Sequence, residues 1–103
     1  MRKIKIPKSF TLGLKQIDVE FDNDHCNDGD QYGEAVFEDG TIILCDTFKG
    51  QPLSKHTIDT TFYHELAHLI LHSIGEHKLK YNEKFVDKLG LAIYEYEISK
   101  KFK

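Results

Sequence analysis

The sequence predicts a small α+β domain in which an antiparallel or mixed sheet of three to four strands precedes two helices. Apolar and polar residues alternate in the first half of the chain, whereas apolar residues recur at helical spacing in the second half. The chain has 103 residues, of which 40% are hydrophobic, and this suits a single hydrophobic core. We therefore expect residues 1–103 to form one domain.

The first strands are expected before residue 22. Apolar and polar side chains alternate at Ile4-Lys5-Ile6 and again over residues 17–21, with Pro7 and Gly13 between the two stretches. This pattern indicates one or two short strands. Residues 22–33 are rich in Asp, Asn and Gly and have no hydrophobic periodicity, which predicts an exposed loop.

A hairpin is expected to complete the sheet. The runs Glu34 to Phe37 and Thr41 to Cys45 are strand-like, and the three residues between them end in Asp-Gly. Asp-Gly between two such runs is a strong turn signal.

The first long helix is expected to begin at an N-cap of Ser54 or Thr57 and to end near Ile74, where Gly75 stops it. Its second half is apolar on most sides, so this helix should be packed from several directions. The second helix should begin at the N-cap Asn82 and continue to near the C-terminus, slightly weakened by Gly90.

Charge and composition exclude some partners. Fourteen basic and seventeen acidic residues give a net charge of -3, which is unsuited to nucleic acid. The basic residues near the two ends are expected to be solvated: Arg2, Lys3, Lys5, Lys100, Lys101 and Lys103. The chain begins without an apolar leader and contains no long apolar run, so we expect a cytoplasmic protein with no membrane partner. Cys26 and Cys45 are then expected to be free thiols.

A metal-binding motif lies in the first predicted helix. Residues 64–68 read HELAH, which is HExxH. Residues four apart lie about 40° apart around a helix, so the imidazoles of His64 and His68 converge on one point that suits a zinc ion. Glu65 flanks that point without replacing a ligand, and we expect it to act as the general base toward metal-activated water.

The third ligand is expected to be Glu83, because a catalytic zinc takes three protein ligands and leaves one open position. Gly75 permits a reversal that brings the start of the second helix beside the first. Asp87 lies one turn after Glu83, where it can accept a hydrogen bond from the outer nitrogen of a ligand histidine, or serve only as a solvated helix charge.

Two rivals for the third position remain open. His72 continues the row from His64 and His68, although three ligands along two turns of one helix cannot easily surround an ion. Cys45 could reach the metal as a thiolate from its strand. His77 is expected to be a surface residue, and His25 has no assigned role.

The motif pair resembles the gluzincin metallopeptidases. HExxH is followed by Asn82-Glu83-Lys84-Phe85-Val86-Asp87, which matches an NExxxD pattern over residues 64–87. The resemblance implies that His64, His68 and Glu83 bind one zinc ion, that Glu65 is the base and that Asp87 orients a ligand histidine. It also implies a zincin-like fold.

In its size and element order the chain also looks like minimal ImmA/IrrE-type metallopeptidases and small phage-encoded relatives. It departs from them at Val86, where an alanine is common, and carries no helix-turn-helix domain. Metzincins are disfavoured because Leu71 and Ile74 occupy their required Gly and His, and SprT-like proteins because no further cysteine pairs are present.

These features predict a zinc peptidase acting on a peptide or protein. We expect the substrate to pair with the strand from Thr41 to Cys45, with its scissile carbonyl at the zinc. Tyr32, Tyr94 and Tyr96 are all candidates for a second oxyanion donor. The alternative is a non-enzymatic zinc protein that binds a regulatory partner. A fourth protein ligand would favour that alternative.

Overall fold

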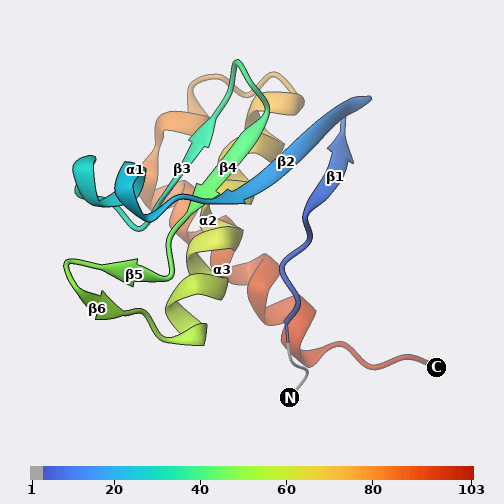
Figure 1. Cartoon of the computed structure of the whole chain (residues 1–103). Coiled ribbons are helices and arrows are strands. Elements are labelled where there is room, and N and C mark those ends of the chain that lie inside the picture. Colours follow the sequence, from blue (N-terminus) through green and yellow to red (C-terminus); the bar gives the residue numbers. More distant parts are fainter. Residues whose placement is uncertain (1–3) are drawn as a thin grey trace.

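The computed structural model describes residues 4–103, so the expectation for Arg2 and Lys3 lies outside the described part (Figure 1). Its strands are β1 (Ser9–Leu12), β2 (Lys15–Phe21), β3 (Gly33–Val36), β4 (Thr41–Leu44), β5 (Thr47–Phe48) and β6 (Gln51–Pro52). Its helices are α1 (Asn23–Asp28), α2 (Lys55–Ser73) and α3 (Glu83–Ser99), with a 3₁₀ turn, η1 (Leu79–Tyr81).

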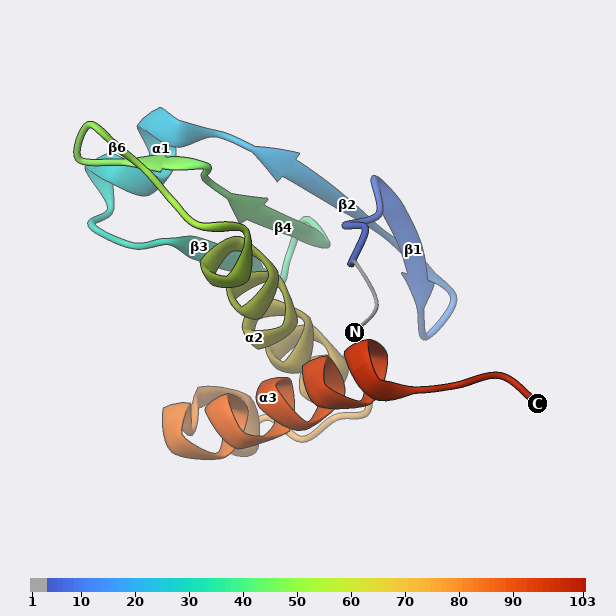
Figure 2. The ribbon, with the colours of Figure 1, turned by 90° about the horizontal axis from the view of Figure 1, so that it is seen from below.

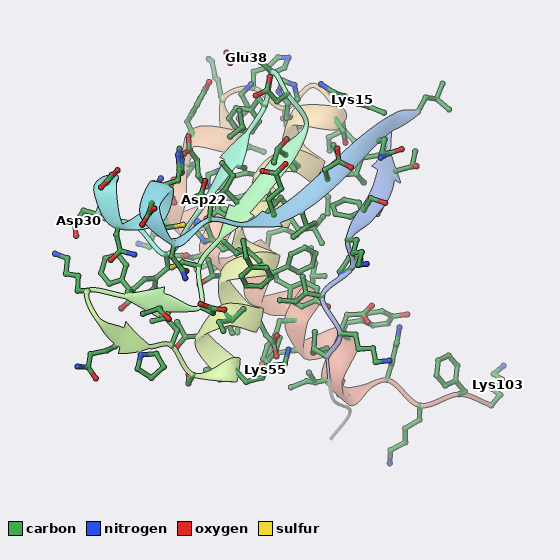
Figure 3. All side chains as sticks on the ribbon, in the orientation of Figure 1. Lys15, Asp22, Asp30, Glu38, Lys55 and Lys103 are labelled. Atoms are coloured by element: carbon green, nitrogen blue, oxygen red, sulfur yellow. The ribbon has the colours of Figure 1, made fainter. Side chains whose placement is uncertain are left out.

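The main sheet is mixed and has the strand order β1-β2-β4-β3. The pairs β1/β2 and β3/β4 are antiparallel, whereas β2 and β4 are parallel. The predicted hairpin is therefore confirmed as β3 and β4, and Val36 faces Thr41 at its closed end. Lys15 and Glu38 lie at that end of the sheet (Figure 3), where the Lys15 ammonium donates to the Glu38 carbonyl over 3.1 Å. The four-stranded mixed sheet followed by helices confirms the predicted α+β class.

The elements form three layers, with α2 between the sheet and α3 (Figure 2). One core cluster fills the space between the sheet and α2: Ile4, Ile17, Ile42, Leu44, Phe62, Tyr63 and Leu69. A second, smaller cluster joins α2 to α3 through Ala67, Leu71 and Val86. The central position expected for the first long helix is confirmed, and it explains why that helix is apolar on most sides.

Both long helices begin and end close to the predicted residues. Ser54 caps α2 by accepting a hydrogen bond from the Thr57 amide, and Gly75 follows the helix with a φ of 82°. Asn82 caps α3 and accepts from the Phe85 amide over 3.1 Å. The second helix ends at Ser99, a few residues before the predicted limit near the C-terminus. Among residues 4–103, no helix combines the length and hydropathy needed to cross a membrane.

Two local predictions were wrong. Residues 4–6 are not a strand, although Ile4 is buried, because alternation also occurs in an extended segment that packs one face on a core. The predicted loop contains helix α1, in which Asp22 caps the helix by accepting from His25 N, and Cys26 is its one buried residue. A helix of six residues is too short to display hydrophobic periodicity.

The small hairpin of β5 and β6 was also not predicted. Lys49 and Gly50 form its turn with φ values of 50° and 79°. Two positive φ angles in succession are typical of a tight hairpin turn. Pro52 ends β6 and pairs with Thr47, a position that a proline tolerates because β6 is an edge strand.

Candidate metal centre

The HExxH motif lies within α2, where His64 and His68 are neighbours on one face. Their ring centroids are 5.0 Å apart. The side chain of His68 is 11% exposed and that of His64 is 23% exposed. The cap at Ser54 and the apolar packing of α2 hold both histidines on a rigid element, as the sequence predicted.

Glu83 meets both histidines from the first turn of α3. One of its carboxylate oxygens lies 3.0 Å from His64 Nε2, and the other lies 3.4 Å from His68 Nε2. The Asn82 cap starts α3 immediately before this residue, and Gly75 provides the reversal that brings α3 beside α2. The structure therefore brings together the three residues predicted as ligands.

The outer nitrogen of each histidine has its own partner. His64 Nδ1 lies 2.7 Å from Asp87 Oδ1, so Asp87 occupies the predicted orienting position. His68 Nδ1 donates to the backbone carbonyl of Lys80 over 2.6 Å. With both Nδ1 atoms occupied, both Nε2 atoms face Glu83. Sequence reasoning missed Lys80, because a backbone carbonyl has no side-chain signature.

These positions fit a metal ion. Ligand atoms at about 2.0–2.1 Å from a tetrahedral zinc lie about 3.3 Å from one another. One ligand atom from each of His64, His68 and Glu83 lies within 4.8 Å of the other two, and the two contacts to Glu83 are 3.0 and 3.4 Å. Burial lowers the pKa of His68, against the opposing effects of the Lys80 carbonyl and Glu83. Imidazole binds a metal in the neutral form that this shift favours.

Glu65 lies beside the three candidate ligands but is not a member of the group that could hold a metal ion. It is 7% exposed, and this burial raises its pKa to about 7. The charge of His64 and a hydrogen bond from the Ala35 backbone amide oppose this increase, whereas the charges of Glu83 and Glu34 add to it. A carboxyl group with a pKa near neutrality can both accept and donate a proton at the pH of a cell.

A cleft of about 710 Å³ opens over the site between β3, α2 and α3. Its walls include the candidate ligands, Glu65 and Asp87, together with residues from β3 and the segments that flank it, which are Gln31, Tyr32, Gly33, Glu34, Ala35 and Phe37. The side chain of Glu34 is partly exposed in this cleft, and one of its oxygens lies 2.6 Å from His25 Nε2. His25, which had no predicted role, therefore holds a cleft residue in place.

The prediction that a substrate pairs with the strand from Thr41 to Cys45 is wrong. The segment from Thr41 to Leu44 forms β4, which lies inside the sheet and pairs with β2 on one side and β3 on the other. Its backbone groups are therefore used within the sheet. The edge strands of this sheet are β1 and β3, and of these two β3 lines the cleft.

The other predicted candidates lie in different surroundings. Tyr32 lines the cleft, as does Tyr81, which was not among the predicted oxyanion donors. Tyr94 instead hydrogen-bonds His56 over 3.2 Å, and Tyr96 packs under the Lys100 ammonium group. Neither Tyr94 nor Tyr96 lines the cleft, so Tyr32 is the predicted oxyanion donor that lies at the site.

The rivals for the third ligand lie outside the three-residue group. His72 Nδ1 is bound to the Lys80 ammonium over 2.8 Å. Cys45 is buried just after β4 without a disulfide, and its sulfur lies 3.4 Å from the Tyr32 carbonyl oxygen. Cys26 is also a free, buried thiol near the same carbonyl. His77 is exposed, as expected.

Gly90 determines how closely α3 approaches the HExxH helix. A Cβ atom at this position would lie 2.9 Å from the Tyr63 carbonyl oxygen and 3.0 Å from His64 Cα. Only glycine therefore permits this contact between the helices. The contact is made at His64 itself, so Gly90 helps to determine the distance between His64 and the carboxylates of α3.

Comparisons with known proteins do not assign the chain to a family. No family model, curated protein or solved structure matches it.

Proposed function

We propose that this protein is a zinc-dependent peptidase in which Glu65 acts as the general base. The observation that carries the proposal is the convergence of His64, His68 and Glu83 on one point beside the buried Glu65. Two imidazole nitrogens and one carboxylate oxygen form a donor set that suits zinc. When bound, zinc would lower the pKa of a water molecule at its open position to about 7 and polarise the substrate carbonyl.

The number of ligands favours an enzyme over a structural zinc protein. Structural zinc sites are closed by four protein ligands, whereas catalytic sites use three and keep one position open. Within residues 4–103, the group of potential ligands has three members, and it faces a cleft. A non-enzymatic binding role, the alternative considered from the sequence, has no comparable observation in its favour.

In the proposed reaction Glu65 transfers a proton twice. It takes a proton from the attacking water and then delivers it to the amine of the departing peptide fragment. Its burial and its pKa of about 7 suit both steps. The hydrogen bond from the Ala35 amide holds the carboxylate against β3, where the substrate would lie.

The substrate is proposed to bind as an additional strand along β3. This strand is an edge of the sheet and forms a wall of the cleft. Extended peptides commonly bind free sheet edges through main-chain hydrogen bonds. Such a peptide would pass directly over Glu65 and the three ligands.

The test is to measure metal content and hydrolysis together. We expect the wild-type protein to contain about one zinc ion per chain and to cleave peptides in a quenched-fluorescent library. His64→Ala and Glu83→Ala should lose both the zinc and the activity, and a chelator should inactivate the wild type until zinc is restored. A zinc-free wild-type protein, or hydrolysis that survives removal of the metal, would refute the proposal.

Replacing Asp87 should weaken metal binding without abolishing it. The Asp87 carboxylate accepts the Nδ1 proton of His64 and thereby fixes the tautomer and orientation of this ligand. We expect Asp87→Ala to lower zinc affinity by about 10–100-fold, measured by competition with a chromophoric chelator. Glu95→Ala, which removes an exposed carboxylate from the same helix, is the matched control and should leave zinc affinity unchanged.

A further inference from the structure

Lys80 is buried, which is unusual for a lysine. It is 6% exposed and lies in η1, in the connection between α2 and α3. Lysine is almost never fully buried unless its charge is paired, because removing an ammonium group from water is costly. The contacts of this side chain therefore require an explanation.

The ammonium group is held by an imidazole and two aromatic rings. Its nitrogen donates to His72 Nδ1 over 2.8 Å and lies 4.4 Å from the centroid of the Phe37 ring and 5.1 Å from that of Tyr81. Among residues 4–103 it forms no ion pair with a carboxylate. Aromatic faces attract cations, and this attraction is stronger away from water.

These partners belong to three different parts of the fold. His72 lies in the last turn of α2, Phe37 follows β3, and Tyr81 ends η1. Phe37 also stacks on His72, with ring centroids 4.9 Å apart and an interplanar angle of 26°. The Lys80 side chain therefore connects η1 to both the sheet and the metal-binding helix.

The backbone of the same residue contacts a candidate ligand. The Lys80 carbonyl accepts from His68 Nδ1 over 2.6 Å in a buried position. A 3₁₀ turn of three residues is weak by itself. Besides Lys80, the turn is held by Leu79, which packs against the cluster between α2 and α3, and by Tyr81, whose ring packs edge-on against Phe37 with centroids 6.0 Å apart.

We propose that Lys80 is a positioning residue of the metal centre. Its anchored ammonium group fixes η1, so that the Lys80 carbonyl oxygen remains on His68 Nδ1. The carbonyl selects the tautomer of His68 that carries its proton on Nδ1, which leaves Nε2 free to bind a metal. The inference rests on the metal centre proposed above, but the His68 tautomer can be observed without metal.

The test compares Lys80→Met, which keeps the apolar stem, with Lys80→Arg, which keeps a cation able to stack on rings and donate to His72. Tyr81→Leu is a second variant at a residue that is 68% exposed, so folding should be retained. Lys78→Met, at an exposed lysine of the same connection, is the matched control.

Nitrogen-proton correlation spectra of the metal-free proteins report the His68 tautomer, with His68→Gln used for assignment. Chelator competition reports zinc affinity.

We expect the wild type, Lys80→Arg and Lys78→Met to keep the Nδ1 proton on His68. Lys80→Met should show a mixture of tautomers and about 10–100-fold weaker zinc binding. Tyr81→Leu should show a smaller change in the same direction. An unchanged tautomer and unchanged zinc affinity in both Lys80→Met and Tyr81→Leu would overturn the proposal, even if unfolding measurements showed lower stability, since Lys80 would then only stabilise the fold. A wild type without zinc would refute the peptidase but not the effect on the tautomer.

Discussion

Glu65→Gln is expected to lower kcat/KM for peptide hydrolysis by a factor of about 10²–10⁴ while the protein keeps its metal. The amide has nearly the same shape as the carboxylate but cannot accept a proton from water. Glu65 lies outside the group of candidate ligands, so its replacement should leave zinc content unchanged. Because burial disfavours the ionised carboxylate, the neutral amide is not expected to destabilise the fold.

The measurement combines steady-state hydrolysis with zinc content and thermal unfolding of the same preparation. Glu34→Gln is the matched control, because Glu34 is a second carboxylate in the cleft but is held by His25 and Gln31. Its rate should change by less than about tenfold. If Glu65→Gln retained activity within that range, or lost its zinc, the general-base role would be wrong.

Local patterns predicted much of the site. His64 and His68 are one helical turn apart, and Ser54 and Asn82 each fix the start of a helix. The histidine spacing and the two helix caps each involve residues only a few positions apart in the sequence. Over such short distances helix geometry alone determines how the side chains are arranged. The position of Glu83 required one more inference, the reversal at Gly75, which the structure confirms.

Contacts between distant segments could not be predicted in the same way. The sequence indicated a hairpin of β3 and β4 but not the parallel pairing of β4 with β2, which places β4 inside the sheet. That pairing depends on which strands meet across the fold rather than on a local pattern. For this reason the prediction that a substrate pairs with β4 was wrong. The contact between the Lys80 carbonyl and His68 was also unpredictable, because any residue type supplies a carbonyl.

Gly90 is the residue at which local reasoning differs most from the structure. Helix propensity treats it as a weak point in α3, since alanine is favoured over glycine by about 1 kcal/mol in an exposed helix. In the fold it is buried against the backbone of Tyr63 and His64. Propensity and packing therefore predict opposite effects of adding a methyl group.

We expect packing to dominate, so that Gly90→Ala lowers the free energy of unfolding by about 1–3 kcal/mol and Gly90→Val lowers it further. The nearest contacts of the added Cβ, at 2.9 and 3.0 Å, are backbone atoms, which cannot move aside as a flexible side chain can. The helices must then separate. Urea unfolding measures the loss, and Lys88→Ala compared with Lys88→Gly gives the propensity difference at an exposed position of the same helix.

The same substitution should weaken metal binding, because α2 carries His64 and His68 whereas α3 carries Glu83. Separating the helices at Gly90 lengthens the 3.0 Å contact between His64 Nε2 and the Glu83 carboxylate. We therefore expect zinc affinity in Gly90→Ala to fall by at least about tenfold, with Lys88→Ala unchanged, as measured by chelator competition. A Gly90→Ala protein with wild-type stability and zinc affinity would contradict this expectation, since it would mean that the ligand geometry tolerates a wider separation of the two helices.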